Sequence, residues 1–188
     1  MNLARIVLFA VFASFVLTGL RTRIAIPEGA EVVKDFDQQR YLGTWYEIAR
    51  IDYKWEKNLN NVTATYSIKE NGMIKVENKG YNVKKSKWQE SEGKAKLDKP
   101  GAGALMVSFF GPFYAEYNII ALDKDYQYAL VAGESTDYLW ILSRQKTIPE
   151  LIKNEFLDQA KRIGYDTNRL TWVGHDPAPS DSASTSAR

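Results

Sequence analysis

Apolar and polar residues alternate along most of the chain between positions 44 and 143, in short runs separated by turn-forming residues. The clearest run is NVTATYSI at 61–68, where Val62, Ala64 and Tyr66 alternate with threonine and serine. A period of two is typical of a strand with one buried face. Similar runs follow the same pattern: TWYEIAR, MIKVENKGY, KWQESEGKAKL, ALMVSFF, AEYNIIALD, YQYALVAG and DYLWILSR. We therefore predict eight consecutive strands that pair as antiparallel neighbours.

A helical period replaces this alternation near the C-terminus. The motif TIPE at 147–150 has the form of a capping box with proline in the first turn, and apolar residues recur at 152, 156, 160 and 163. Gly164 ends the pattern. We predict a helix over 148–163, followed by a ninth short strand at 170–173.

Eight antiparallel strands connected in sequence define an all-β fold class and leave three arrangements open. They can lie in an open sheet, form a sandwich, or close on themselves into a barrel. Closure removes the exposed strand edges that promote aggregation. A barrel of eight strands is either filled by its own side chains or holds one small ligand, so the strand count does not decide the function.

The two ends of the chain differ from this region. Residues 1–20 carry one charge at Arg5, followed by the apolar run IVLFAVFASFVLTGL. That run is shorter than the ~20 residues that span a bilayer, and its basic start is typical of a secretory signal. Residues 21–34 form a polar leader, and the polar composition of 175–188 predicts a disordered tail. We expect one domain at 35–174.

Composition narrows the classes of function. The 25 basic and 23 acidic residues give a net charge of +2, without the basic excess of a nucleic-acid-binding protein. The chain has no cysteine, and its one histidine is at 175, so the strands contain neither a thiol nucleophile nor a histidine base. No spacing of acidic residues indicates a metal site. We expect no metal, no cofactor and no enzymatic activity.

Three short motifs resemble those of the lipocalin family. YLGTWYEIAR contains the Gly-x-Trp motif at Gly43 and Trp45, ALDKDYQYALV resembles the second motif at Asp125 and Tyr126, and ILSR supplies the third motif's Arg144. The segments SEGKA and VSFFGPFY resemble the outer-membrane lipocalins of bacteria in particular. The resemblance covers about 35–173. It implies an eight-stranded antiparallel up-and-down barrel of the lipocalin/calycin type, with the C-terminal helix packed on its outside.

In such a barrel, the start of the first strand, the turn between strands six and seven, and the end of strand eight lie at the same end. Trp45, Asp125, Tyr126 and Arg144 should therefore meet and close that end as structural residues. A guanidinium above a tryptophan face contributes roughly 0.5 to 2 kcal/mol.

The opposite end and the interior form the predicted ligand site. Alternation along the strands directs apolar and aromatic side chains inward, and the turn in FFGPFY places rings around the opening. The predicted cavity and rim residues are Ala64, Tyr66, Ile74, Val76, Val107, Phe109, Phe110, Phe113, Tyr114, Tyr117, Tyr128, Leu130, Tyr138 and Trp140. Lys84, Lys85 and Lys87, in the connection between strands three and four, are candidates for binding an anionic head group. Glu47 and Asn78 add polar side chains to the predicted interior.

An apolar interior suits a chain-shaped lipid, because each buried CH₂ contributes ~0.8 kcal/mol. The resemblance implies a protein that stores or transports fatty acids or lysophospholipids in the bacterial cell envelope, with a membrane surface as a further partner. Members of the family can also form homodimers. Three alternatives remain: a barrel filled by its own rings, a carrier of a tetrapyrrole or isoprenoid, and a lipocalin-fold enzyme that uses Glu47 as a base.

The resemblance does not decide how the protein is attached to a membrane. LTGL at 17–20 resembles the lipobox of bacterial lipoproteins, in which the last position is the cysteine that becomes acylated. Leu20 occupies that position here, so this chemistry is excluded at that residue. We expect a location in the periplasm or at the outer membrane.

Overall fold

The computed structural model describes residues 24–53 and 56–176. The signal-like segment 1–20 and most of the predicted tail lie outside these residues. In chain order the elements are α1 (Gln38–Tyr41), β1 (Gly43–Ile51), β2 (Leu59–Ile68), β3 (Ile74–Asn82), β4 (Lys87–Leu97), β5 (Ala104–Phe110), β6 (Phe113–Leu122), β7 (Tyr128–Ala132), β8 (Leu139–Ser143), α2 (Glu150–Ile163), a short 3₁₀ helix (Thr167–Arg169) and β9 (Leu170–Trp172).

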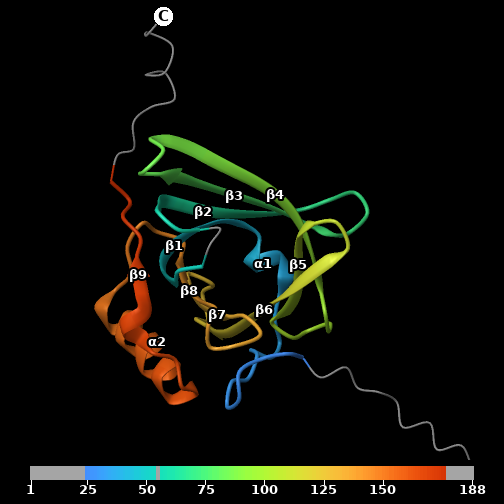
Figure 1. The fold of residues 1–188 in the computed structure, drawn as a ribbon. Coiled ribbons are helices and arrows are strands. Elements are labelled where there is room, and N and C mark those ends of the chain that lie inside the picture. The colour runs from blue at the N-terminus through green and yellow to red at the C-terminus, as the bar shows by residue number, and fades with distance from the viewer. Residues whose placement is uncertain (1–23, 54–55, 177–188) are drawn as a thin grey trace, which may run out of the picture.

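Strands β1 to β8 close into an antiparallel barrel, which confirms the predicted fold class. The order of hydrogen-bonded strands is β2-β3-β4-β5-β6-β7-β8-β1-β9, and β2 also pairs with β1. The closing pair aligns Gly43 with Tyr66 and Trp45 with Ala64. β9 extends the sheet by pairing with the second half of β1. Figure 1 looks roughly along the barrel, with β9 and α2 outside the ring of strands.

Apolar side chains form two separate clusters, one on each face of the barrel wall. The inner cluster includes Trp45, Leu105 and Val131, all buried inside the barrel. The outer cluster joins residues such as Ile141 to Phe156 of α2. Because successive strand residues point to opposite faces, a strand that lies beneath α2 is buried on both sides.

Helix α2 begins at Glu150, two residues after its predicted start. Pro149 precedes it in an extended conformation, with φ −61° and ψ 139°, and makes no side-chain cap. The predicted capping box therefore does not form. The helix ends as predicted at Gly164, whose φ of 100° allows its N–H to bond back to the carbonyl of Lys161.

The described part of the leader is held against the barrel. The backbone N–H of Val33 donates to the carbonyl of Ile119, and the carbonyl of Val33 accepts from Gly103, both at 2.9 Å. The amide of Asn118 donates to the carbonyl of Ala25 at 3.0 Å. Within the described ranges, no helix is both long enough and apolar enough to cross a membrane.

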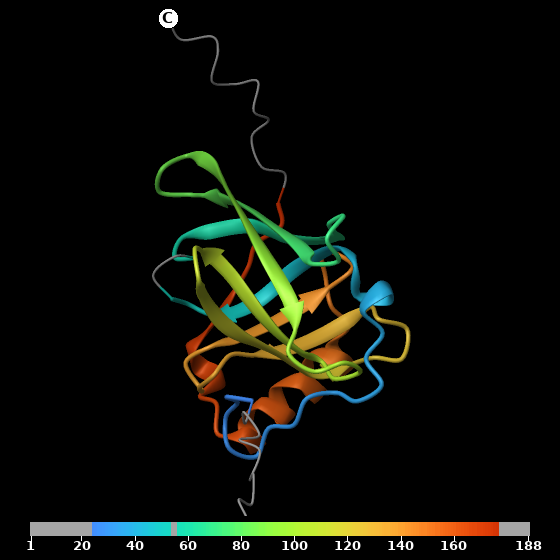
Figure 2. The same ribbon diagram turned by 90° about the vertical axis from the view of Figure 1, so that its right-hand side faces the viewer.

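Arg144 closes one end of the barrel. Its guanidinium carbon lies 3.9 Å from the centre of the Trp45 ring. Its nitrogens donate, over 2.8 to 3.3 Å, to the backbone carbonyls of Arg40, Tyr41, Leu42, Thr44 and Tyr126. Gly43 lies beside it with φ 91°, a conformation that favours glycine. The structure thus brings the residues of the first and third motifs together, and Figure 2 shows α1 at this end.

The turn before β7 is organised by Asp123 and not by Asp125 of the second motif. The Asp123 carboxylate accepts hydrogen bonds from the backbone N–H groups of Asp125, Gln127 and Tyr128, at 3.0, 2.6 and 2.6 Å. The side chain of Asp125 is exposed. Tyr126 adopts a φ of 58° in this turn, and its hydroxyl accepts from the backbone N–H of Asp37 at 2.9 Å.

Candidate ligand-binding site

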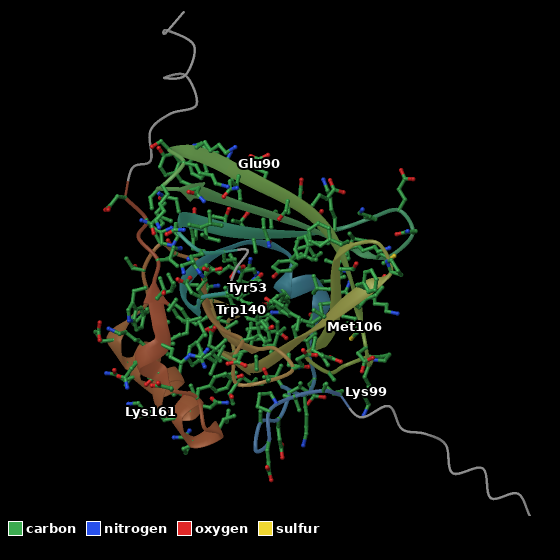
Figure 3. All side chains as sticks on the ribbon, in the orientation of Figure 1. Tyr53, Glu90, Lys99, Met106, Trp140 and Lys161 are labelled. Atoms are coloured by element: carbon green, nitrogen blue, oxygen red, sulfur yellow. The ribbon has the colours of Figure 1, made fainter. Side chains whose placement is uncertain are left out.

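Three neighbouring cavities occupy the interior and the open end of the barrel. An inner cavity has a volume of about 150 Å³, a mouth cavity about 580 Å³ and a side cavity about 210 Å³. Tyr53 and Phe109 line all three. In Figure 3, Tyr53 and Trp140 lie near the centre of the ring of strands. The interior is therefore partly filled by rings and still retains open volume.

The inner cavity is lined largely by the residues that the strand pattern predicts to face inward. Its lining includes seven of the predicted ligand residues: Ala64, Tyr66, Val76, Val107, Phe109, Tyr117 and Trp140. They come from β2, β3, β5, β6 and β8. Ile74 is buried in the inner cluster but lies outside the lining of this cavity.

The mouth cavity is bordered by the β5–β6 turn. Phe110 and Phe113 line it while remaining 67% and 78% exposed, and Tyr114 joins them. Across the opening, Tyr138 stacks on Trp140 with ring centres 6.4 Å apart. The rings of FFGPFY therefore border the opening of the barrel.

Two tyrosines that line the inner cavity, Tyr66 and Tyr117, form a hydrogen-bonded group with Tyr41. Tyr66 donates its hydroxyl to Tyr117 at 2.9 Å, and the hydroxyls of Tyr41 and Tyr117 are 2.8 Å apart. Burial raises the pKa of Tyr66 to about 12 and the pKa values of Tyr41 and Tyr117 well above their usual value. These hydroxyls are neutral and bonded to one another.

Two predicted cavity residues, Tyr128 and Leu130, lie on the outer face instead. Both pack in the cluster beneath α2, whereas their neighbours Ala129 and Val131 point inward. The sequence YALVA is buried along almost its whole length. Because both faces of β7 are covered, its sequence lacks the polar alternation needed to predict the phase.

The structure does not bring the three predicted head-group lysines to the cavities. Lys84, Lys85 and Lys87 are exposed at the tip of the β3–β4 hairpin, and none of them lines the mouth, side or inner cavity. Figure 2 shows this hairpin rising on the side of the barrel opposite α2. Lys79 is the basic residue that lines the side cavity, and it pairs with Glu90 at 2.9 Å.

A buried ionic cluster centred on Arg50 was missed by the sequence analysis. Arg50 donates through one terminal nitrogen to Glu47 Oε1 at 2.6 Å and through Nε to Asp52 Oδ1 at 2.7 Å. Its other terminal nitrogen donates to the carbonyls of Glu56 and Leu59 at 2.7 and 3.3 Å. Trp140 Nε1 donates to Glu56 Oε2 at 3.0 Å.

A β-bulge explains why strand alternation did not predict this cluster. The pairing of β1 with β8 shifts by one residue between Glu47 and Ala49. Glu47 therefore faces inward beside Leu142, and the extra residue turns Arg50 inward as well, opposite Trp140. The only available signal was the presence of two charged residues, Glu47 and Arg50, in a strand that is otherwise largely apolar.

One guanidinium faces three carboxylates in this cluster. Burial raises the pKa of Glu47 to about 8, and the nearby Glu56 carboxylate adds to the effect while Arg50 opposes it. Burial also raises the pKa of Glu56. At neutral pH the cluster therefore retains a proton that isolated carboxylates would have lost.

His175, which we expected in the disordered tail, packs against the barrel. Its Nε2 lies 2.8 Å from the carbonyl oxygen of Glu47, at the β-bulge, and its ring meets Tyr46 edge-on. The described chain thus reaches back to β1 after β9.

These features are those of one protein family. The family model described as a lipocalin-like domain matches residues 36–175. This chain belongs to the lipocalin family. The lipocalin is 55% identical over 148 residues to the outer membrane lipoprotein Blc of Escherichia coli, covering 78% of this chain and 84% of that protein. It is 51% identical over 168 residues to Blc of Citrobacter freundii, covering 89% and 94%. The predicted resemblance to bacterial outer-membrane lipocalins is confirmed.

A more distant relative and a solved structure are also similar to this chain. Temperature-induced lipocalin-1 of Arabidopsis thaliana is 32% identical over 160 residues, covering 81% of this chain and 86% of that protein. The structure of insecticyanin from the tobacco hornworm Manduca sexta aligns with a TM-score of 0.63 at 19% identity, covering 82% of this chain and 86% of that one. These relatives are named as lipocalins, lipoproteins and a cyanin, not as enzymes.

Proposed function

We propose that this lipocalin binds a fatty acid or a lysophospholipid in its barrel, with the acyl chain inside. The observation that carries the proposal is the combination of an open, ring-lined mouth of about 580 Å³ with an adjacent inner cavity of about 150 Å³. Burial of apolar surface drives such binding, at ~0.8 kcal/mol for each CH₂ before the entropic losses of association. A narrow cavity lined by rings and short aliphatic side chains favours a flexible chain.

We also propose a location in the bacterial cell envelope. The relatives that support it are the Blc proteins, which are named as outer membrane lipoproteins. Contact with a lipid surface is part of the same proposal, because Phe110 and Phe113 expose their rings at the mouth. A lipid that leaves a membrane would meet these rings before reaching the interior.

The surroundings of Glu47, the candidate catalytic base, favour a binding role over catalysis. Glu47 is bonded to Arg50 and buried, and the single histidine lies on the outer face beside Tyr46. A carrier of a tetrapyrrole or isoprenoid is the second candidate.

A competition assay tests the proposed function. A fluorescent fatty acid is bound to the purified protein and then titrated with lysophosphatidylcholine, with protoporphyrin as the alternative ligand. Full displacement by the lysophospholipid at micromolar concentration, with little displacement by the porphyrin, is expected. Displacement by the porphyrin alone would instead favour the second candidate, and failure of the fluorescent fatty acid to bind would sink the lipid proposal.

A further inference from the structure

The inner cavity has an imbalance between hydrogen-bond acceptors and donors. Its lining contains the carboxylates of Glu47, Glu56 and Glu116, and among the described residues that form it none is a lysine or arginine. Arg50 lies behind these carboxylates, and all three of its nitrogens already donate to the Glu47 and Asp52 carboxylates and to backbone carbonyls. Arg50 itself is not among the residues that line the cavity.

Two other donors of the lining are engaged within the protein. Trp140 Nε1 donates to Glu56, and the Tyr66 hydroxyl donates to Tyr117. By contrast, the Oδ1 atom of Asn78 and the Oε2 atom of Glu116 are buried and accept no hydrogen bond, and both residues line the same cavity. A polar group that enters this cavity therefore meets two acceptor atoms that lack donors.

We propose that the inner cavity binds the ammonium head of a long-chain amine, held by Glu47 and Glu56, with the alkyl chain extending through the ring-lined mouth. The proposal rests on the proposed function in one respect, namely that the barrel binds chain-shaped amphiphiles. An ammonium group carries donors only and a positive charge, which matches both the unused acceptors and the excess of carboxylates. It thereby supplies the second cation that Arg50 alone does not provide.

The size and walls of the cavity fit a small cation. A volume of about 150 Å³ corresponds to a few heavy atoms, because one water molecule takes ≈ 30 Å³ in the liquid. The rings of Trp140 and Phe109 form part of the wall, and aromatic faces attract cations. A carboxylate head in the same place would lie against the carboxyl groups of Glu47, Glu56 and Glu116 in a poorly solvated site, which is unfavourable. An anionic lipid should therefore leave its head at the mouth.

Proton linkage gives this interaction a characteristic dependence on pH. In the empty barrel the Glu47 carboxyl, with a pKa of about 8, is mostly protonated at neutral pH. A bound cation favours the ionised carboxylate and displaces that proton. The affinity for an amine should rise from about pH 6 to about pH 8, because the amine itself stays charged up to about pH 10. The affinity for an uncharged alcohol should not follow this profile.

Isothermal titration calorimetry with dodecylamine, dodecanol and dodecanoate, three ligands of equal chain length, tests the proposal on the full chain. At about pH 8 we expect dodecylamine to bind about ten-fold or more tightly than dodecanol, since hydrogen bonds between charged groups are roughly twice as strong as those between neutral groups. Glu47→Gln should weaken dodecylamine about ten-fold and change dodecanol less than about two-fold. Glu77→Gln, on the outer surface in a pair with Lys75, is the matched control and should change neither.

Equal affinities of the wild-type protein for dodecylamine and dodecanol would overturn the proposal, as would a parallel loss of both in Glu47→Gln. If that variant fails to fold, the ratio of the two wild-type affinities across pH 6 to 8 decides instead, because a constant ratio contradicts the proposal. The same measurements distinguish failure of the proposed function from failure of this inference. If the proposed function is wrong, neither the twelve-carbon ligands nor the lysophospholipid bind. If only the amine site is wrong, dodecanol and the lysophospholipid bind, and dodecylamine binds no more tightly than dodecanol.

Discussion

At the scale of single residues, the sequence predicted the position of one arginine, Arg144, and did not predict that of another, Arg50. Arg144 donates to backbone carbonyls at the closed end, and its position follows from chain topology because three chain segments must meet there. Arg50 is buried among carboxylates and could not be predicted, because the bulge after Glu47 changes the alternation by one residue. A motif predicts a contact only where no irregularity shifts the register.

Replacing Arg144 by lysine should destabilise the fold. A lysine ammonium has three N–H donors, whereas the planar guanidinium of Arg144 has five and bonds to five backbone carbonyls. Several of these carbonyls would therefore lose their hydrogen-bond donor. We expect urea unfolding to show a loss of about 2–4 kcal/mol. The matched control is Arg169→Lys, at an exposed pair with Asp137, which should change stability by less than about 0.5 kcal/mol. Equal effects of the two substitutions would contradict the structural role of Arg144.

The buried Glu47 carboxyl should make the protein less stable as the pH rises. Its pKa is about 8 in the folded chain and 4.5 in its usual environment, so the folded state holds the proton over a range where the unfolded state has lost it. Stability contributed by this group is therefore lost progressively between about pH 4.5 and pH 8, at up to 1.36 kcal/mol per pH unit. Thermal melting of the wild-type protein should show a falling Tm across this range, and Glu47→Gln should flatten the fall. An unchanged slope in that variant would show that other groups are responsible.

At the scale of elements, strands with one solvated face were easier to predict than strands with two buried faces. β2 alternates between polar and apolar residues, and its inward residues Ala64 and Tyr66 line the inner cavity as predicted. β7 has apolar residues on both faces, so Tyr128 and Leu130 were assigned to the wrong side. Only the position of α2, which covers β7, shows which residues of β7 face the interior and which face the helix.

The β5–β6 turn should contribute to ligand uptake and little to folding. Phe110 and Phe113 are mostly exposed, and Gly111 between them has a φ of 57° that suits a tight turn. We expect Phe110→Ser combined with Phe113→Ser to weaken binding of a fluorescent fatty acid several-fold while the Tm changes by less than about 3 °C.

A control for this rim variant is Leu151→Ser, which removes an exposed apolar side chain from α2, away from the mouth. It should leave both binding and Tm nearly unchanged. Loss of folded structure in the rim variant would mean that these rings belong to the core.

At the scale of the whole molecule, the closed barrel and its external helix were predictable, whereas the polar chemistry of the interior was not. Strand count, turn positions and the three motifs together specify the topology, because each constrains the same ends of the same strands. The interior cluster depends on tertiary burial, which converts ordinary carboxyls such as Glu47 into groups with raised pKa values. The lysines of the β3–β4 hairpin were misplaced because this hairpin extends away from the mouth.

That hairpin has a consequence for how the protein behaves at high concentration. β4 begins at Lys87 but pairs with β5 only through Lys94 to Leu97, so its first residues present backbone groups without a strand on that side. An unpaired edge of this kind can recruit a second chain. If two copies paired antiparallel about position 90, two Glu90 carboxylates, each paired with Lys79 of its own chain, would lie opposite each other, and like charges in that position disfavour pairing. The acidic side chain thus disfavours pairing with a second chain at this edge of the sheet.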